Sequence, residues 1–262
     1  GLGDVYKRQD MKCTIGYVGA MNYASLQELQ MVNNTLIPSY LDISYASFAS
    51  LLPHAGKELD INLFLAHREV EILQVKANVE LASHTYSHYY CLEEGQTIED
   101  FENDVRMAKE NAIKQGVNLV SIIFPRNQVN DDYLTICRKY GFTHFRGMLN
   151  SFLYKPSKTP FRYSPMGALR FLDTYLNISG NNTYTIEDTK SKELIDVPGS
   201  RFFRPYSRKL SFLEGLKIRR IKQSMTDAAK NGRIYHLWWH PHNFGTYMQE
   251  NLSLLELSLI HI

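Results

Sequence analysis

The sequence is poor in cysteine, lacks a long apolar run and carries little net charge. Its three cysteines, Cys13, Cys91 and Cys137, are an odd and sparse set that offers no disulfide framework and favours a reducing compartment. No apolar stretch is long enough to cross a bilayer and no secretory signal is visible, so we expect no transmembrane segment and a cytoplasmic location. The formal net charge of +2 gives no reason to expect nucleic-acid binding.

Both ends of the chain resemble translated adapter sequence rather than native protein. Residues 1–9 contain no initiator methionine, and residues 257–262 have the same character. Excluding these segments leaves a length that suits one large α/β domain or two small ones, with 44% hydrophobic residues available for a core. We expect a single domain over residues 12–256, from which a native upstream segment is missing.

The first half of the chain alternates between strand and helix patterns. Short apolar runs typical of buried strands occupy residues 12–20, 79–82, 118–124 and 142–145. Helical spacing of apolar residues occupies residues 59–75, 97–115 and 131–140, whereas residues 33–55 form an irregular excursion. Thr97 and Asp100 have the spacing of a helix-capping box, and Gly116 closes that helix. The alternation predicts an α/β fold with a parallel sheet.

The second half of the chain is less regular. Residues 150–208 are rich in Pro, Ser, Asn and Tyr and predict long loops over the sheet edge, with one helix near residues 166–176. A strong helix is expected at residues 209–230 and the last strand at residues 233–239. Five basic residues lie along one side of that helix: Lys209, Lys217, Arg219, Arg220 and Lys222. They would permit association with a membrane surface, although a solvated helix face is the simpler interpretation.

Two histidines, His84 and His88, follow the strand-like run at residues 79–82. Where a strand gives way to a loop, a spacing of four residues can direct both imidazoles to one point, and imidazole is a common metal ligand. Two surface histidines near a strand end are the alternative. Arg126 and His240 also follow predicted strands. Since active sites of parallel α/β folds form at the carboxyl ends of strands, we expect these residues to share one site.

Three segments carry a family resemblance. Ser-His-Thr-Tyr-Ser-His at residues 83–88 resembles the second motif of the polysaccharide deacetylases, the NodB-homology carbohydrate esterases. Phe-Pro-Arg at residues 124–126 and His-Leu-Trp-Trp-His-Pro-His-Asn-Phe at residues 236–244 fall where that family has later motifs. The resemblance implies a distorted (β/α) barrel whose first strand is missing here. The family's usual third motif has Arg before Pro, whereas this chain has Pro125 before Arg126.

The resemblance also implies an activity, which is the metal-dependent removal of acetyl groups from a saccharide. The substrate would be a polysaccharide, a surface polysaccharide precursor or a lipid-linked oligosaccharide. His84 and His88 would bind a divalent metal, with zinc the expected ion. His240 would donate a proton to the leaving group, and Arg126 would orient the base carboxylate.

Three more residues are expected to contact the substrate. Trp239 could line the acyl pocket, with an ordinary core position as the alternative. Arg204 lies in the aromatic-rich segment 200–207, whose arginines could clamp an acidic sugar or a phosphate or simply occupy a solvated loop. His242 competes with His240 for the role of proton donor.

The family's catalytic base has no counterpart in this sequence. The family carries two adjacent aspartates at the end of its first strand, one as general base and one as metal ligand, and only Asp4 and Asp10 precede the first predicted strand here. Asp173 and Asp196 fall in the loop-rich segment with no predicted strand to direct them. We therefore expect poor catalysis from this chain. A non-catalytic member that binds carbohydrate or metal, and a different metal-dependent amidohydrolase, stay open as alternatives.

Overall fold

The computed structural model describes residues 12–33, 38–46, 64–148, 151–154, 165–190 and 193–259. The chain forms two compact units, each with a hydrophobic core of its own. The sheet unit consists of Lys12–Arg146 and Ser191–Asp196, and the C-terminal unit contains Gly147–Lys190 and Val197–Ile262. A single domain over residues 12–256 stays a prediction.

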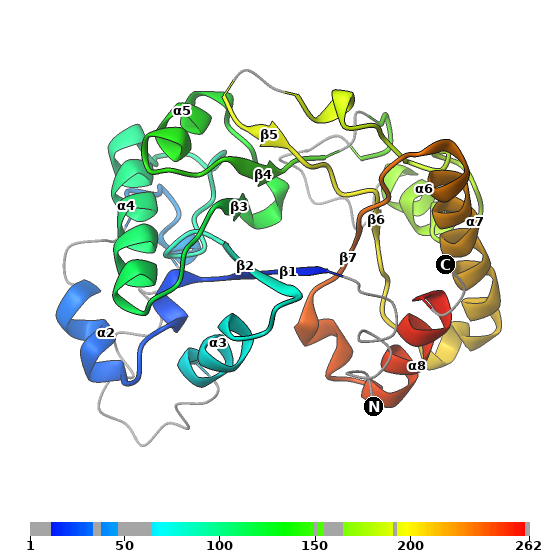
Figure 1. Ribbon diagram of the computed structural model, residues 1–262, viewed down its shortest axis with the longest axis horizontal. Coiled ribbons are helices and arrows are strands. Elements are labelled where there is room, and N and C mark those ends of the chain that lie inside the picture. Colours follow the sequence, from blue (N-terminus) through cyan, green and yellow to red (C-terminus); the bar gives the residue numbers. More distant parts are fainter. Residues whose placement is uncertain are drawn as a thin grey trace. The chain divides into compact units, whose positions relative to one another are not determined.

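The sheet unit is built on five parallel strands in the order β1-β2-β3-β4-β5 (Figure 1). The strands are β1 (Cys13–Tyr17), β2 (Val79–Ser83), β3 (Ser121–Ile123), β4 (His144–Arg146) and β5 (Ile195–Asp196). Each strand pairs with the next one in sequence, which is the order found in (β/α) barrels. The predicted α/β fold with a parallel sheet is confirmed, and the described strands form an open sheet and no closed barrel.

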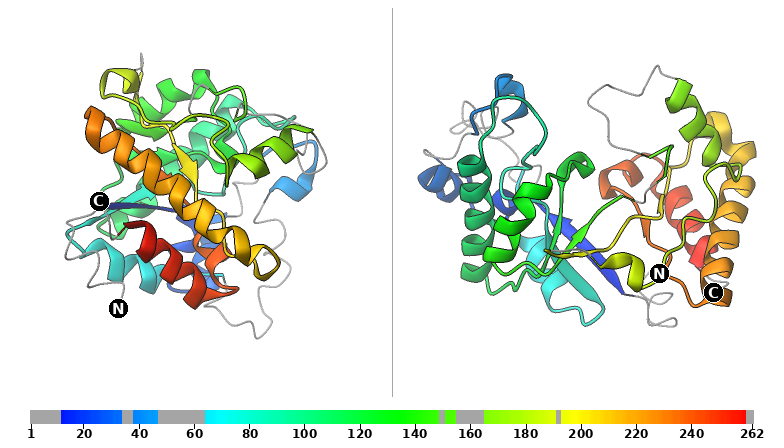
Figure 2. Two further views of the ribbon diagram at one scale, coloured as in Figure 1. Left: turned by 90° about the vertical axis from the view of Figure 1, so that its right-hand side faces the viewer. Right: turned by 90° about the horizontal axis from the view of Figure 1, so that it is seen from above.

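Helices connect the strands of the sheet unit and cover its core (Figures 1 and 2). They are α2 (Leu26–Asn33), α3 (His67–Gln74), α4 (Ile98–Lys114) and α5 (Asp131–Lys139). Helices α4 and α5 lie side by side, and the ring of Phe101 stacks on that of Tyr133 with centroids 4.3 Å apart. Together with Ile122, Phe124 and Phe145 from the strand side, these rings form the main core.

Helix α4 begins where the sequence predicts. Thr97 Oγ1 accepts a hydrogen bond from the Asp100 amide (3.1 Å), and the Asp100 carboxylate accepts one from the Thr97 amide (3.0 Å). Two apolar residues of this predicted helix are exposed, Ile98 at 45% and Ile113 at 68%. Ile113 lies about 120° around the helix axis from the buried Phe101, which directs it away from the core.

The described residues of the C-terminal unit form a two-stranded parallel sheet and three α-helices. The strands are β6 (Arg201–Phe202) and β7 (Leu237–Trp238), and the helices are α6 (Pro165–Asp173), α7 (Glu214–Asn231) and α8 (Met248–Leu259). Helices α7 and α8 pack together around Ile221 and Leu255. Short 3-10 turns in the two units span Gly19–Met21, Ile43–Tyr45, Pro125–Asn127, Glu187–Thr189, Arg208–Leu213 and Pro241–Phe244.

Two predictions about chain segments need correction. Residues 150–208 are not only loops, because β5 joins the main sheet and β6 pairs with β7. Each of these strands has two residues, which is too short to give an apolar period in the sequence. The helix expected at residues 59–75 begins at His67, with residues 59–63 outside the described part of the chain.

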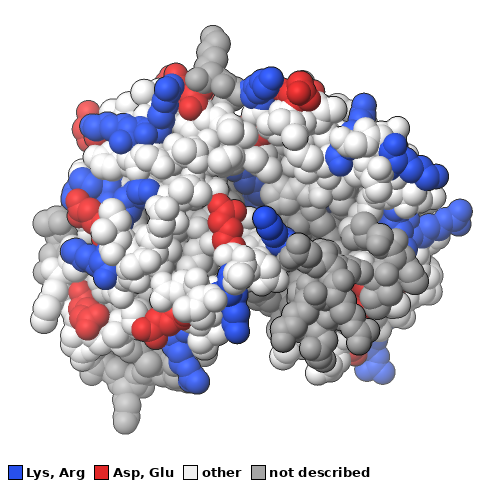
Figure 3. Space-filling view, in the orientation of Figure 1, with Lys and Arg blue, Asp and Glu red and all other residues white. Residues whose placement is uncertain are grey.

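The sequence left association with a membrane surface open, and several features of the described residues concern it. None of their helices combines the length and apolarity needed to span a bilayer. Acidic and basic side chains are interspersed over the face shown in Figure 3. The basic side predicted for the helix at residues 209–230 is only partly present, because Lys217 and Arg220 are buried. Lys209 and Arg219 are exposed, and Lys222 is half-buried.

Candidate functional site

The carboxyl ends of the parallel strands carry three of the predicted site residues. β2 ends at Ser83, and the segment with His84 and His88 follows directly. β3 ends at Ile123, and Arg126 lies in the 3-10 turn that comes next. The predicted position of these residues at strand ends is therefore confirmed. Because the strands are parallel and adjacent, this edge of the sheet is where the fold places functional side chains.

The two imidazoles lie against each other. Their ring centroids are 4.9 Å apart with an interplanar angle of 70°. Nδ1 of His84 lies 2.7 Å from the carbonyl oxygen of Ile123 on the adjacent strand. Because a carbonyl oxygen only accepts, Nδ1 carries the hydrogen, and the lone pair of the neutral ring lies on Nε2. Histidine ligands of metals are commonly oriented by a hydrogen bond of this kind from the other ring nitrogen.

The loop between the two histidines is held by a buried carboxylate from α4. Asp104 accepts hydrogen bonds from the Tyr86 amide (2.7 Å), the Ser87 amide (2.9 Å) and the Ser87 hydroxyl (2.5 Å). Thr85 Oγ1 accepts a further bond from the Tyr89 amide (2.7 Å). Burial raises the pKa of Asp104 to about 6, although its three donors favour the charged form. The His84–His88 backbone is thus fixed from inside the protein.

Four residues other than glycine adopt a positive φ at this edge of the sheet. They are Thr85 (64°), His88 (60°), Arg126 (53°) and Asn127 (53°). Each such residue costs about 1–3 kcal/mol, and residues held this way concentrate at functional sites. For Arg126, the strain is not repaid by its exposed ion pair, because such pairs contribute about 0–1 kcal/mol.

Arg126 has a defined set of partners. Its Nη1 lies 3.2 Å from Oε1 of Glu93, and its guanidinium carbon lies 4.2 Å from the ring centroid of Tyr90 and 5.2 Å from that of Tyr45. Nε2 of Gln128 donates to the same Glu93 oxygen (2.8 Å). Glu93 is therefore the carboxylate that Arg126 holds among the described residues, and it was not predicted from the sequence.

Arg146 is a further residue that sequence reasoning missed. It ends β4 and lies opposite Ile123 of β3. A Cβ atom added at Gly16 would meet both Ile123 and His84, so Ile123 and His84 lie on the same face of the sheet. Arg146, paired with Ile123, lies on this face too. Its Nη2 donates to Oδ1 of Asn127 (2.7 Å), and burial lowers the pKa of Arg146 to about 10. The sequence did contain a signal for Arg146, because the strand predicted at residues 142–145 ends one residue before it.

The expectation that no strand directs Asp196 is wrong. Asp196 ends β5 and lies opposite Phe145 of β4 in the parallel ladder. Since Phe145 packs in the main core, the register puts Asp196 on the face of the sheet opposite to His84. In the described part of the chain, no cluster of three or more His, Cys, Asp or Glu residues suits a metal ion. The assignment of His84 and His88 as metal ligands stays a prediction.

The other predicted site residues lie in the C-terminal unit. His240 lies two residues after the end of β7, close to its predicted position at a strand end, and its ring centroid lies 5.9 Å from that of Phe202, 5.6 Å from that of Trp238 and 5.3 Å from that of His242, on which it stacks at 16°. A site shared between His240 and His84 stays a prediction.

Trp239 and Arg204 have partners of their own in this unit. Trp239 stacks on Phe244 with centroids 5.8 Å apart and packs against the core, which is the alternative that the sequence left open. Arg204 lies over the ring of Phe171 at 5.0 Å. Neither contact tests a role in substrate binding.

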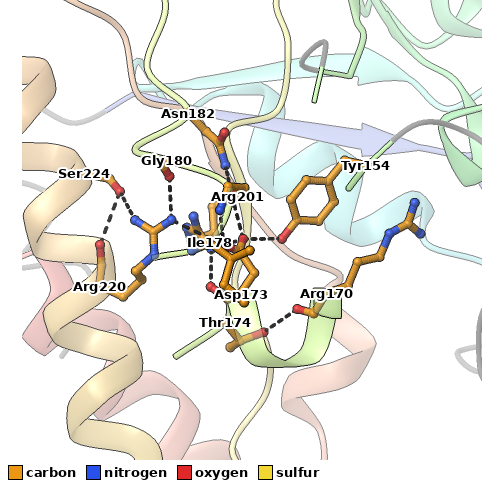
Figure 4. Close-up of polar contacts among 11 residues, drawn as sticks. Tyr154, Arg170, Asp173, Thr174, Ile178, Gly180, Asn182, Arg201, Arg220 and Ser224 are labelled. Atoms are coloured by element: carbon orange, nitrogen blue, oxygen red, sulfur yellow. Dashed lines mark hydrogen bonds and ion pairs between the residues drawn. The ribbon is translucent and has the colours of Figure 1, made fainter. Parts of the chain in front are cut away.

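A buried ion cluster in the C-terminal unit contains Asp173 and Arg201. Figure 4 shows Arg201, Arg220 and Tyr154 converging on Asp173. Arg201 Nη1 lies 3.2 Å and Arg220 Nη2 lies 3.7 Å from its carboxylate, and the Tyr154 hydroxyl donates to it at 2.7 Å. Asp173 is therefore committed to internal contacts and cannot serve as a base. Arg201 is likewise buried and cannot clamp a ligand from an exposed loop.

Comparison with known proteins gives two distant likenesses. No family model and no curated protein sequence matches the chain. The chain is similar to a Mycobacterium smegmatis crystal structure described provisionally as a polysaccharide deacetylase, at 12% identity and a TM-score of 0.48, covering 96% of this chain and 85% of that one. It is also similar to the 4-α-glucanotransferase of Thermococcus litoralis, at 11% identity and a TM-score of 0.40, covering 99% of this chain and 32% of that one. At these TM-scores neither likeness carries an argument.

The raised pKa of Asp104 predicts a pH dependence of stability. Because the folded-state pKa of about 6 exceeds the ordinary 3.8, the folded protein holds this proton more tightly than the unfolded chain. The free energy of unfolding should therefore fall as pH rises from about 4 to about 6, by roughly 3 kcal/mol from this group. Urea unfolding between these pH values measures the effect. Asp104→Asn should lose this pH-dependent part of the free energy of unfolding, whereas the control Glu94→Gln, at an exposed position, should keep it. Equal slopes in the two variants would contradict the assignment.

Asp173→Asn should destabilise the C-terminal unit by about 3–5 kcal/mol, because it leaves two buried guanidinium groups without a counter-charge. Burial alone would raise the pKa of Asp173, but the Tyr154 hydroxyl, the Arg201 charge and Ser179 outweigh it and hold the pKa below its ordinary value. Both tryptophans of the chain lie in this unit, so their fluorescence during urea unfolding reports on it. Asp227→Asn, at a half-buried position, is the control. A similar loss of unfolding free energy in both variants would show that the ion cluster does not stabilise the unit more than an ordinary carboxylate does.

Proposed function

We propose that this chain is a metal-dependent hydrolase that removes acetyl groups from a saccharide, with His84 and His88 as metal ligands and zinc as the expected ion. The observation that carries the proposal is the pair of imidazoles 4.9 Å apart at the carboxyl edge of a parallel sheet. The hydrogen bond from His84 Nδ1 to a strand carbonyl supports it, since this bond leaves Nε2 as the coordinating nitrogen. The resemblance of residues 83–88 to the second deacetylase motif supports both the activity and a distorted (β/α) barrel.

The chain's own residues would prepare this site for acyl transfer. A bound divalent metal would polarise the acyl carbonyl and lower the pKa of a water molecule. The Ile123 carbonyl holds the His84 ring, and Asp104 fixes the backbone that leads to His88. Arg146 shares the sheet face of His84, where its positive charge would stabilise negative charge on the acyl oxygen.

The remaining roles come from the C-terminal unit. We assign His240 as the proton donor to the leaving group because it follows the last strand, and His242, whose ring stacks on it, is the alternative. Trp239 would contribute to the acyl pocket and Arg204 to saccharide binding. The substrate is a polysaccharide or a lipid-linked oligosaccharide, with N- and O-acetyl groups both open.

A binding protein without turnover is the second candidate. It is favoured by the donor set, because among the described residues no third acidic, thiol or imidazole side chain joins the histidine pair. The engagement of Asp173 in a structural cluster points the same way. Acetate release from an acetylated oligosaccharide by the metal-loaded protein would favour the hydrolase, and binding without release would favour the second candidate.

His84→Ala and His88→Ala should each abolish zinc binding, because either change removes one of the two imidazoles assigned as ligands and a single imidazole is far short of a protein zinc site. Titration calorimetry of the metal-free protein with zinc measures the effect. His144→Ala is the matched control, since His144 belongs to the same unit but starts β4 at the opposite edge of the sheet. Unchanged zinc affinity in the first two variants would refute the assignment of the ligands.

His240→Ala should lower kcat for deacetylation by roughly 10²–10⁴-fold while zinc binding is retained, as expected for loss of a general acid. Steady-state assays of acetate release, combined with zinc titration of the same preparation, separate the two effects. His242→Ala serves as the comparison. If His242→Ala loses turnover and His240→Ala does not, then His242 is the proton donor.

A further inference from the structure

Arg126 and Glu93 form an ion pair at the carboxyl edge of the sheet unit. The Arg126 side chain is 49% exposed and that of Glu93 is 22% exposed, with 3.2 Å between Nη1 and Oε1. The rings of Tyr90 and Tyr45 lie under the guanidinium, so it is held by stacking as well as by charge. An exposed pair fixed in this way has lost the side-chain freedom that makes most surface ion pairs ineffective.

The supports of this pair extend into the fold. Gln128 donates to Glu93 Oε1 (2.8 Å) and accepts from the Leu92 amide (3.1 Å). The Tyr90 amide donates to the buried hydroxyl of Tyr40 (2.7 Å), which fixes the backbone below the ring. Arg126 itself adopts a φ of 53°. The free-energy cost of this strained conformation is larger than the stabilisation that an exposed ion pair provides. The strained backbone of Arg126 and the contacts that hold its side chain indicate that the guanidinium is positioned for a function and not for stability.

The hydrogen-bonding groups that remain on the pair define the ligand. Within the described residues, Oε2 of Glu93 accepts no hydrogen bond, and Arg126 donates only through Nη1. A guanidinium donates and a carboxylate accepts, so the two together suit a group that does both, such as neighbouring hydroxyls. A phosphate or a uronate would pair with Arg126 but would be repelled by Glu93. The charge-balanced pair therefore favours a neutral polyol over an anion.

The pair also lies beside the histidines. The ring of Tyr90, on which Arg126 stacks, contacts the ring of His88 with centroids 5.1 Å apart. A saccharide with its acyl group at the histidine pair would extend across Tyr90 to Arg126. We propose that Arg126 and Glu93 bind the hydroxyl groups of a neutral sugar residue adjacent to the residue that carries the acyl group.

This inference rests on the proposed function for the choice of a saccharide, and it gives Arg126 a different task from the one that the family resemblance implies. Arg126 contacts the substrate directly and selects neutral sugars, and it does not orient a catalytic base. Tyr45 and Tyr90 act as positioning residues, because they hold the guanidinium and leave its outer edge to the ligand.

Binding of two tetrasaccharides to the metal-free protein tests the proposal. The neutral probe is tetra-N-acetylchitotetraose, the acidic probe is tetragalacturonate, and calorimetry at low salt measures both affinities. The parent protein should bind the neutral probe more tightly. Glu93→Gln removes the negative charge but keeps the side-chain shape, so it should weaken the neutral probe about fivefold and strengthen the acidic probe about fivefold. Arg126→Gln should weaken both probes.

Glu110→Gln is the matched control. Glu110 pairs with Arg106 on α4 at 2.9 Å, and both side chains are exposed, so this variant removes the same charge from an equivalent surface ion pair. It should leave both affinities unchanged. Preference of the parent for the acidic probe, no binding of the neutral probe, or equal behaviour of Glu93→Gln and Glu110→Gln would overturn the proposal. Zinc titration of the same samples separates the sugar site at Arg126 and Glu93 from the metal site at His84 and His88. Zinc binding without saccharide binding overturns only the sugar site. Saccharide binding without zinc binding overturns only the metal site.

Discussion

The segment that carries both histidines depends on one buried carboxylate, that of Asp104. Its oxygens accept three hydrogen bonds from Tyr86 and Ser87, which lie between His84 and His88. Without these acceptors two backbone amides in the interior would have no partner, at a cost of about 1–3 kcal/mol each. Burial makes the charged form of this carboxylate less favourable than it is in water, as its raised pKa indicates. The fold therefore accepts an electrostatic cost in order to hold this loop in one conformation.

The two units use buried charge in different ways. Asp104 meets only neutral donors, and its pKa moves up, whereas Asp173 meets Arg201 and Arg220, and its pKa moves down. The first arrangement fixes a loop with strained residues and titrates within reach of neutral pH. The second ties α6, β6 and α7 together and stays charged. Of the two clusters, only the first supports a candidate site.

The sequence was informative wherever a signal was local. The cap formed by Thr97 and the strand-end positions of His84 and Arg126 could be predicted from neighbouring residues alone. Asp196 could not be placed, because a two-residue strand has no period and owes its existence to pairing with β4, some fifty residues away in the chain. The burial of Arg220 was missed for a similar reason, since its partner Asp173 comes from another helix. Contacts between distant segments decide such positions, and one sequence does not display them.

The central claim is that the histidine pair at the carboxyl edge of the sheet coordinates a divalent metal. X-ray absorption at the zinc edge, recorded on the zinc-loaded chain, tests it most directly because the spectrum identifies the ligands of the ion. The account predicts two imidazole nitrogens at about 2.0–2.1 Å, with oxygen atoms in the remaining positions. A zinc shell made only of oxygen atoms, without imidazole scattering, would contradict the account.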